Sequence, residues 1–209
     1  MKFFKLQLDI LVNPIQVNIF TQTLLSLKPQ KAILSINIKD WMMERLIYYM
    51  KEKSKFMLRA IELSIQSAKS KGGPFGCVIV RDNKIIAEGF NQVTANNDPT
   101  AHAEIVAIRK ACENQNNFFL KGCDLYATCE PCPMCLSAIY WSHIDNIFYA
   151  NTRLDAKNID FDDSFIYSEI NKDIENRKIK MHQMHRDEAL EAFKTVSYTH
   201  LTLPTICSV

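Results

Sequence analysis

Between residues 51 and 196, apolar positions recur with the periods of helices and strands. Apolar residues three and four positions apart predict helices over residues 55–69, 101–112, 132–141, 163–170 and 187–196. Short runs rich in β-branched and aromatic residues predict strands over 77–80, 85–89, 125–128 and 147–150, with a further strand near 178–184. Helices and strands in this order predict one mixed sheet with helices on its faces.

The two ends of the chain do not share these periods. Residues 1–49 are apolar but lack a clean repeat, and the sequence from Met50, MKEKSKFMLRA, resembles a natural N-terminus. We therefore place one domain at residues 50–196 and interpret residues 1–49 as an upstream extension. Residues 197–209, SYTHLTLPTICSV, resemble a translated sequencing adaptor, and we interpret them as a non-native tail.

Composition narrows the class of protein. The 209 residues are 47% hydrophobic and 23% charged, as in ordinary globular domains, and no stretch of 18 apolar residues predicts a membrane span. A net charge of +2 gives no support for a nucleic-acid partner. Seven cysteines without a signal peptide indicate a reducing, cytoplasmic compartment, where clustered cysteines are typical of metal or redox chemistry.

Two short segments carry candidate chemistry: TAHAE at residues 100–104 and EPCPMC at residues 130–135. Cys132 and Cys135 are three residues apart at a predicted helix start, so both sulfurs can face one point. His102, at the start of another helix, would supply a third ligand. Three ligands of this kind, with a fourth position left open, are typical of catalytic Zn²⁺.

Glu104 is the predicted catalytic residue, shuttling protons to and from zinc-bound water. Three alternatives remain open at this point. The C-x-x-C pair is compatible with a thioredoxin-like redox site. A structural zinc would need a fourth ligand, for which Cys129 is the candidate. A non-catalytic zinc module would not need Glu104.

The combination of H-x-E with P-C-x-x-C is the signature of zinc nucleobase deaminases. The chain resembles the cytidine-deaminase-like superfamily and, within it, the small bacterial guanine deaminases, over about residues 56–193. The resemblance rests on residues 72–76 (GGPFG), 97–104 (NDPTAHAE), 129–135 (CEPCPMC) and 161–167 (FDDSFIY). It implies a three-layer α/β/α fold with a central mixed five-stranded sheet, and hydrolysis of guanine to xanthine and ammonia.

The same resemblance implies the substrate contacts. Asn91 would hydrogen-bond the purine, Asp163 would hold the guanine edge, and Phe75 and the backbone near Ala103 would line the base pocket. Each assignment has a structural alternative, because Asn91 could cap a turn, Asp163 could cap a helix and Phe75 could belong to the core.

A rival within the superfamily is a tRNA adenosine deaminase, which shares the metal motif. The near-neutral charge and residues 161–167 favour a small purine base over tRNA. The resemblance further implies a homodimer, domain-swapped where a native C-terminal tail closes the partner's site.

Overall fold

The computed structural model describes residues 32–198, with side chains described from 41 to 195. The predicted extension lies outside the described residues up to residue 31, and the predicted tail lies outside them from residue 199. The chain divides into two units, one ending at Thr152 and the other starting at Arg153. Within residues 32–198, no helix has both the length and the hydropathy that a bilayer span requires.

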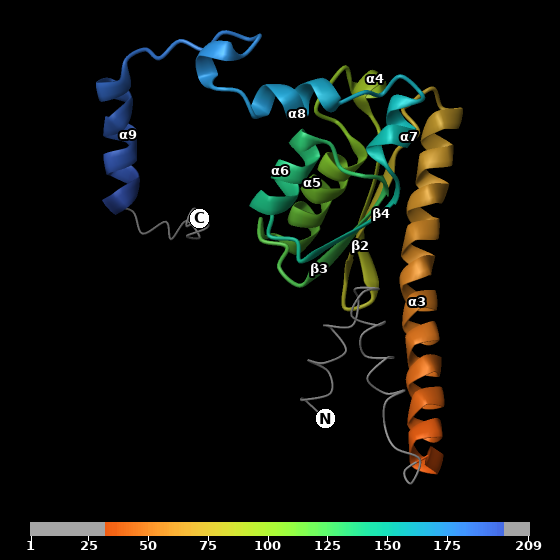
Figure 1. Cartoon of the computed structure of the whole chain (residues 1–209). Helices are drawn as coiled ribbons and strands as arrows, with labels where there is room; N and C mark the ends of the chain where they lie inside the picture. Colours follow the sequence, from red (N-terminus) through yellow and green to blue (C-terminus); the bar gives the residue numbers. More distant parts are fainter. Residues whose placement is uncertain (1–31, 199–209) are drawn as a thin grey trace. The chain divides into compact units, whose positions relative to one another are not determined.

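A mixed sheet forms the centre of the first unit (Figure 1). Its strands are β1 (Gly76–Arg81), β2 (Lys84–Phe90), β3 (Cys123–Cys129) and β4 (Asn146–Asn151), in the order β2-β1-β3-β4. β1 pairs antiparallel with β2 and with β3, whereas β3 and β4 are parallel. The predicted hairpin and the mixed character of the sheet are therefore confirmed.

The prediction of five strands is wrong for the described residues, because their sheet has four. The segment expected to be a further strand, residues 178–184, is irregular. Its apolar side chains Ile179, Met181 and Met184 are exposed by 80%, 55% and 73%. A strand needs a ladder partner and a buried face, and this segment has neither in the structure.

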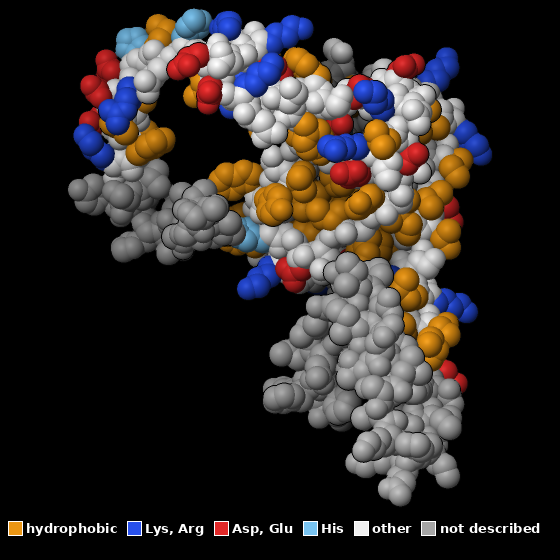
Figure 2. Space-filling model, viewed as in Figure 1, with side chains coloured by type: hydrophobic (Ala, Val, Ile, Leu, Met, Phe, Trp, Pro, Cys, Tyr) orange, Lys and Arg blue, Asp and Glu red, His pale blue; other side chains and the backbone are white. Residues whose placement is uncertain are grey.

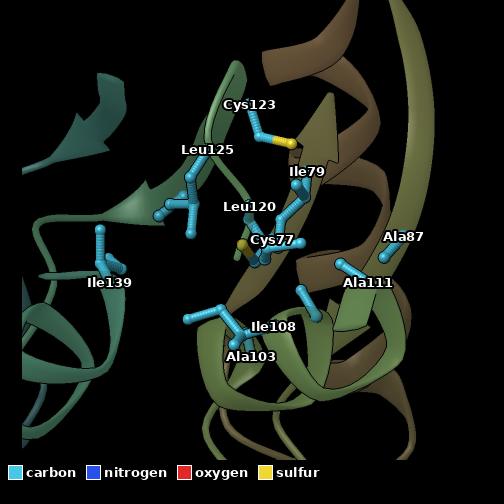
Figure 3. Packing of buried hydrophobic residues seen from close by; sticks show 12 residues of the cluster. Cys77, Ile79, Ala87, Ala103, Ile108, Ala111, Leu120, Cys123, Leu125 and Ile139 are labelled. Atoms are coloured by element: carbon cyan, nitrogen blue, oxygen red, sulfur yellow. The ribbon is translucent and has the colours of Figure 1, made fainter. Parts of the chain in front are cut away.

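Helices cover both faces of the sheet, α3 (Ala32–Lys69) on one and α5 (Ala103–Gln115) and α6 (Pro133–Trp141) on the other (Figure 1). Alternation along β1 produces two cores. Cys77 and Ile79 belong to the cluster under α5, shown in Figure 3, while Val78 belongs to the cluster under α3. Because side chains alternate along a strand, and β1 is buried from Gly76 to Val80, this one strand contributes to both clusters.

Two glycines set how closely these helices approach the sheet. A Cβ at Gly89 would lie 2.1 Å from the Ala103 carbonyl oxygen, and a Cβ at Gly76 would lie 2.2 Å from the Ala60 carbonyl oxygen. Each helix therefore rests directly on strand backbone. Gly89 matters most for function, because it fixes the first turn of α5.

The helices differ from the predictions mainly at their ends. α3 begins at Ala32, well before the predicted helix at 55–69, and α5 begins at Ala103. Short helices not predicted are α4 (Val93–Asn96), α7 (Arg153–Lys157) and the 3-10 turn η2 (Ile174–Asn176). In the second unit, α8 (Ser164–Ile170) and α9 (Arg186–Tyr198) match the two predicted helices closely.

Candidate metal centre and active site

Three metal-ligating side chains meet at the ends of two helices. The ligand atoms of His102, Cys132 and Cys135 all lie within 4.8 Å of one another. His102 presents Nδ1 to both sulfurs, at 3.6 Å from Cys132 Sγ and 3.5 Å from Cys135 Sγ. The structure therefore brings together all three residues predicted as zinc ligands.

Local sequence explains why these residues converge. His102 and Cys132 are the extended residues directly before α5 and α6, with ψ of 156° and 167°. Pro133 occupies the first position of α6, where its missing N–H costs no hydrogen bond. Cys135 follows in the first turn. Both helix N-termini thus point positive dipole ends at the cluster, which favours thiolates.

The side chains of the cluster shift one another's pKa values. Hydrogen bonding from Cys135 and from His102 lowers the pKa of Cys132 to about 4, although burial opposes this. The hydrogen bond with Cys132, together with burial, raises the pKa of Cys135. Interaction with Cys132 also raises the pKa of His102. Metal binding would require both thiols to lose their protons, and the low pKa of Cys132 favours this for one of them.

Glu104 adjoins the cluster from the first turn of α5. Its side chain is 7% exposed, and burial raises the pKa of its carboxyl group. Interactions with Cys132, His102 and Cys135 also affect the pKa of this carboxyl group, so Glu104 lies beside the cluster. The two-residue spacing from His102 therefore does not carry Glu104 away from the cluster, because His102 precedes the helix and Glu104 lies inside it.

The donor set fits a catalytic Zn²⁺. Tetrahedral zinc with sulfur and nitrogen ligands separates neighbouring ligand atoms by roughly 3.5–3.8 Å, which matches the observed Nδ1–Sγ distances. Cys129, the candidate fourth ligand of a structural site, instead directs its sulfur to the Thr152 carbonyl oxygen at 3.6 Å. Within the described residues the cluster has three ligands and no fourth, which leaves a coordination position for water or substrate.

Asn91 follows directly on β2 and is 8% exposed. Its Oδ1 accepts a hydrogen bond from the Val93 backbone N–H at 3.3 Å, so it caps the turn that enters α4. The next residue, Gln92, donates its backbone N–H to the Ala101 carbonyl at 2.9 Å. That bond ties this turn to the residue immediately before His102. The role of Asn91 toward a purine stays a prediction.

Phe75, Ala103 and Asp163 occupy three different settings. Phe75 packs against the core cluster under α5, and Ala103 is a buried member of that cluster. Asp163 lies in the second unit and precedes α8. The capping contacts there are made by Asp162, whose Oδ1 accepts from the Ser164 N–H at 2.9 Å and from its hydroxyl at 2.5 Å.

One residue near the site was not singled out by the sequence. Cys77 on β1 is completely buried, and this burial, together with the charge of the Glu104 carboxylate, raises the pKa of its thiol. A cysteine within an apolar strand carries no pattern that separates this position from an ordinary core residue.

Comparison with known proteins gives the family. A model of the cytidine and deoxycytidylate deaminase zinc-binding region matches residues 50–151. Guanine deaminase of Bacillus subtilis (strain 168) is 52% identical over 140 residues, which cover 66% of this chain and 90% of that protein. A tRNA-specific adenosine deaminase of Buchnera aphidicola is 37% identical over 135 residues, 64% of this chain and 87% of that protein.

A solved structure is also similar to this chain. The crystal structure of Bacillus subtilis guanine deaminase superposes with a TM-score of 0.67 at 50% identity, covering 69% of this chain and 92% of that one. Over nearly equal lengths, identity is thus clearly higher to the guanine deaminase than to the tRNA enzyme. The chain belongs to the bacterial guanine deaminases of the cytidine-deaminase-like zinc superfamily.

Proposed function

We propose that this chain hydrolyses guanine to xanthine and ammonia at the His102–Cys132–Cys135 cluster. The observation that carries the proposal is the placement of Glu104, a buried carboxyl group beside three zinc ligands with an open fourth position. Thiolate ligands must stay reduced, which is consistent with the cytoplasm as the compartment in which the chain works.

His102, Cys132 and Cys135 would hold the zinc ion. When bound, it supplies Lewis-acid activation of water near neutral pH. Glu104 takes up the first proton of the attacking water and delivers it to the ring nitrogen. It then takes up the second proton, from the hydroxyl group now on the carbon, and delivers it to the departing amino group, so that guanine and water become xanthine and ammonia. The carboxyl group accepts and returns each proton without net change.

Asn91 and Asp163 would select the base. The Asn91 amide offers both a donor and an acceptor to a purine edge, and the Asp163 carboxylate accepts from N–H groups that guanine presents and adenine does not. Phe75 and the backbone near Ala103 would complete the pocket wall.

The deciding experiment is a substrate panel read out by ammonia release. Zinc-loaded full-length protein is offered guanine, adenine, cytosine and an anticodon stem-loop RNA with adenosine at the wobble position. We expect release from guanine, with kcat/KM far above that for every other substrate. Release from the RNA with none from guanine would replace the proposal with tRNA adenosine deamination.

We further propose that the chain forms a homodimer. Hydrophobic side chains gather on the face that carries α6 and β4 (Figure 2), where Tyr140, Trp141 and Tyr149 are 71%, 76% and 50% exposed. Apolar patches of this kind are typical of protein interfaces. Light scattering after gel filtration should give twice the chain mass, and Trp141→Glu should reduce it. Leu58→Glu, at an apolar position on α3 that is 57% exposed, is the control.

A further inference from the structure

Ser67 lies in the last turn of α3 and is 2% exposed. Its hydroxyl donates to the Gly73 carbonyl oxygen at 2.8 Å and lies 3.2 Å from the Asn91 carbonyl oxygen. A hydroxyl has one proton, so it is donated mainly to the closer acceptor, the Gly73 carbonyl oxygen. The Asn91 carbonyl oxygen is a second, weaker acceptor. One buried hydroxyl therefore joins the end of α3, the glycine turn and the residue that follows β2.

The glycine turn carries this contact to the Asn91 side chain. A Cβ at Gly73 would lie 3.0 Å from Asn91 Cγ and 3.1 Å from its Nδ2, so the bare backbone of Gly73 lies against the amide group. A Cβ at Gly72 would lie 2.5 Å from Ser67 Oγ. The missing side chain at Gly72 thus leaves room for the Ser67 hydroxyl. The missing side chain at Gly73 lets the turn lie against the Asn91 amide.

Backbone hydrogen bonds fix the rest of this contact region. The Gly72 N–H donates to the Ser67 carbonyl at 2.9 Å, and the Asn91 N–H donates to the Phe75 carbonyl at 3.1 Å. A third bond, from the Phe75 N–H to the Gly73 carbonyl at 2.8 Å, links Gly73 to the residue whose carbonyl accepts the Asn91 N–H. The Ser67 hydroxyl adds a side-chain hydrogen bond to the same Gly73 carbonyl, so it reinforces the position of Gly73 against the amide.

We propose that Ser67 is a positioning residue for substrate, acting through Gly73 to hold the Asn91 amide where it meets the purine. This inference rests on the proposed function, because the contact of Asn91 with the base is itself proposed. Ser67 would not touch the substrate. Its loss should loosen the amide and weaken base binding while leaving the zinc ligands and Glu104 in place.

The test compares Ser67→Ala with Ser64→Ala. Ser64 lies one turn earlier on α3, is also buried, and donates only to the Ile61 carbonyl of its own helix, at 2.9 Å. We expect Ser67→Ala to raise KM for guanine about three- to tenfold, with kcat within about twofold and zinc content unchanged. Ser64→Ala should leave all three unchanged. Equal KM values in the two variants would overturn the inference.

A second readout does not depend on turnover. In protein labelled with ¹⁵N-asparagine, the Asn91 side-chain NH₂ signal, assigned by its loss in Asn91→Asp, should shift in Ser67→Ala and not in Ser64→Ala. An unshifted signal would overturn the positioning role even if guanine is the substrate. If guanine yields no ammonia, the proposed function fails, while this signal still decides the role of Ser67. Should Ser67→Ala not fold, Ser67→Cys keeps the side-chain size with a weaker donor and should show smaller shifts in both readouts.

Discussion

The two units of the chain bury their apolar side chains to very different degrees. In the first unit, both faces of the sheet are covered, and side chains such as Ile79 and Leu125 are completely buried. In the second unit, Ala156 alone is buried among residues 153–195. Large apolar side chains there are exposed, including Leu154, Ile159, Phe161, Phe165, Ile166, Ile170 and Phe193.

This difference separates the chemistry from the choice of substrate. The predicted metal ligands and Glu104 belong to the well-packed unit, whose helix starts can hold reacting groups in place. Asp163, proposed to recognise guanine, belongs to a unit that does not bury a core of its own. Segments with few buried contacts open at low free-energy cost, so substrate selection should be the more easily altered property. The predictions below test this division.

The largest expected effect concerns the first unit. Glu104→Gln keeps the shape of the side chain but removes its ability to accept a proton. We expect kcat for guanine to fall by about a thousandfold or more, because general acid–base catalysis typically contributes up to about 10⁴. Zinc content, measured by mass spectrometry of the metal, should be unchanged. A variant that retains its rate would remove Glu104 from the mechanism.

The next effect concerns the packing that supports the site. Gly89→Ala would force α5 away from β2, because the new Cβ would meet the Ala103 carbonyl oxygen at 2.1 Å. We expect the free energy of unfolding in urea to fall by about 3 kcal/mol. The control is Gly122→Ala, at a φ of 82° with no atom within 4 Å of the new Cβ, which should cost about 1–2 kcal/mol from backbone strain alone. Equal losses would contradict the proposed close packing.

The second unit is tested through its two adjacent carboxylates. Asp163→Asn should lower kcat/KM for guanine by about ten- to a hundredfold, since an amide cannot accept every N–H that a carboxylate accepts. Asp162→Asn, which removes a capping carboxylate one residue away, should change kcat/KM much less. If both variants retain wild-type kcat/KM, substrate choice would have to be assigned to the first unit as well.

Local patterns predicted the chemistry better than they predicted the architecture. The two cysteines and His102 could be found because ligand type and helix-start position are written in short segments of sequence. A fifth strand was expected from the run at residues 178–184 and from family resemblance, but so short a run does not specify a ladder partner, and these residues form no strand. The apolar but irregular sequence of residues 32–50 concealed the N-terminal half of α3.

Contacts between distant residues could not be predicted at all. The Ser67 hydroxyl reaches Asn91, 24 positions along the chain, and Gly89 accommodates a carbonyl of α5. Neither residue stands out locally, since a serine near a helix end and a glycine in a strand are common. Such contacts exist only once the sheet and helices have assembled, and they determine how accurately the predicted site residues are placed.

The smallest expected effect is electrostatic and confined to the second unit. Hydrogen bonds from Ser164, together with Lys157, lower the pKa of Asp162 to about 2. A lowered pKa in the folded state means that the Asp162 contact stabilises α8 above the pKa of the unfolded chain, about 3.9. That stabilisation is lost as the pH falls through about 2. NMR titration should show the Asp162 carboxyl and the Ser164 amide changing together near that pH, and Asp162→Asn should abolish the amide titration. A carboxyl that titrates near 3.9 would show that the α8 cap does not form in solution, and the second unit would then lack even its local order.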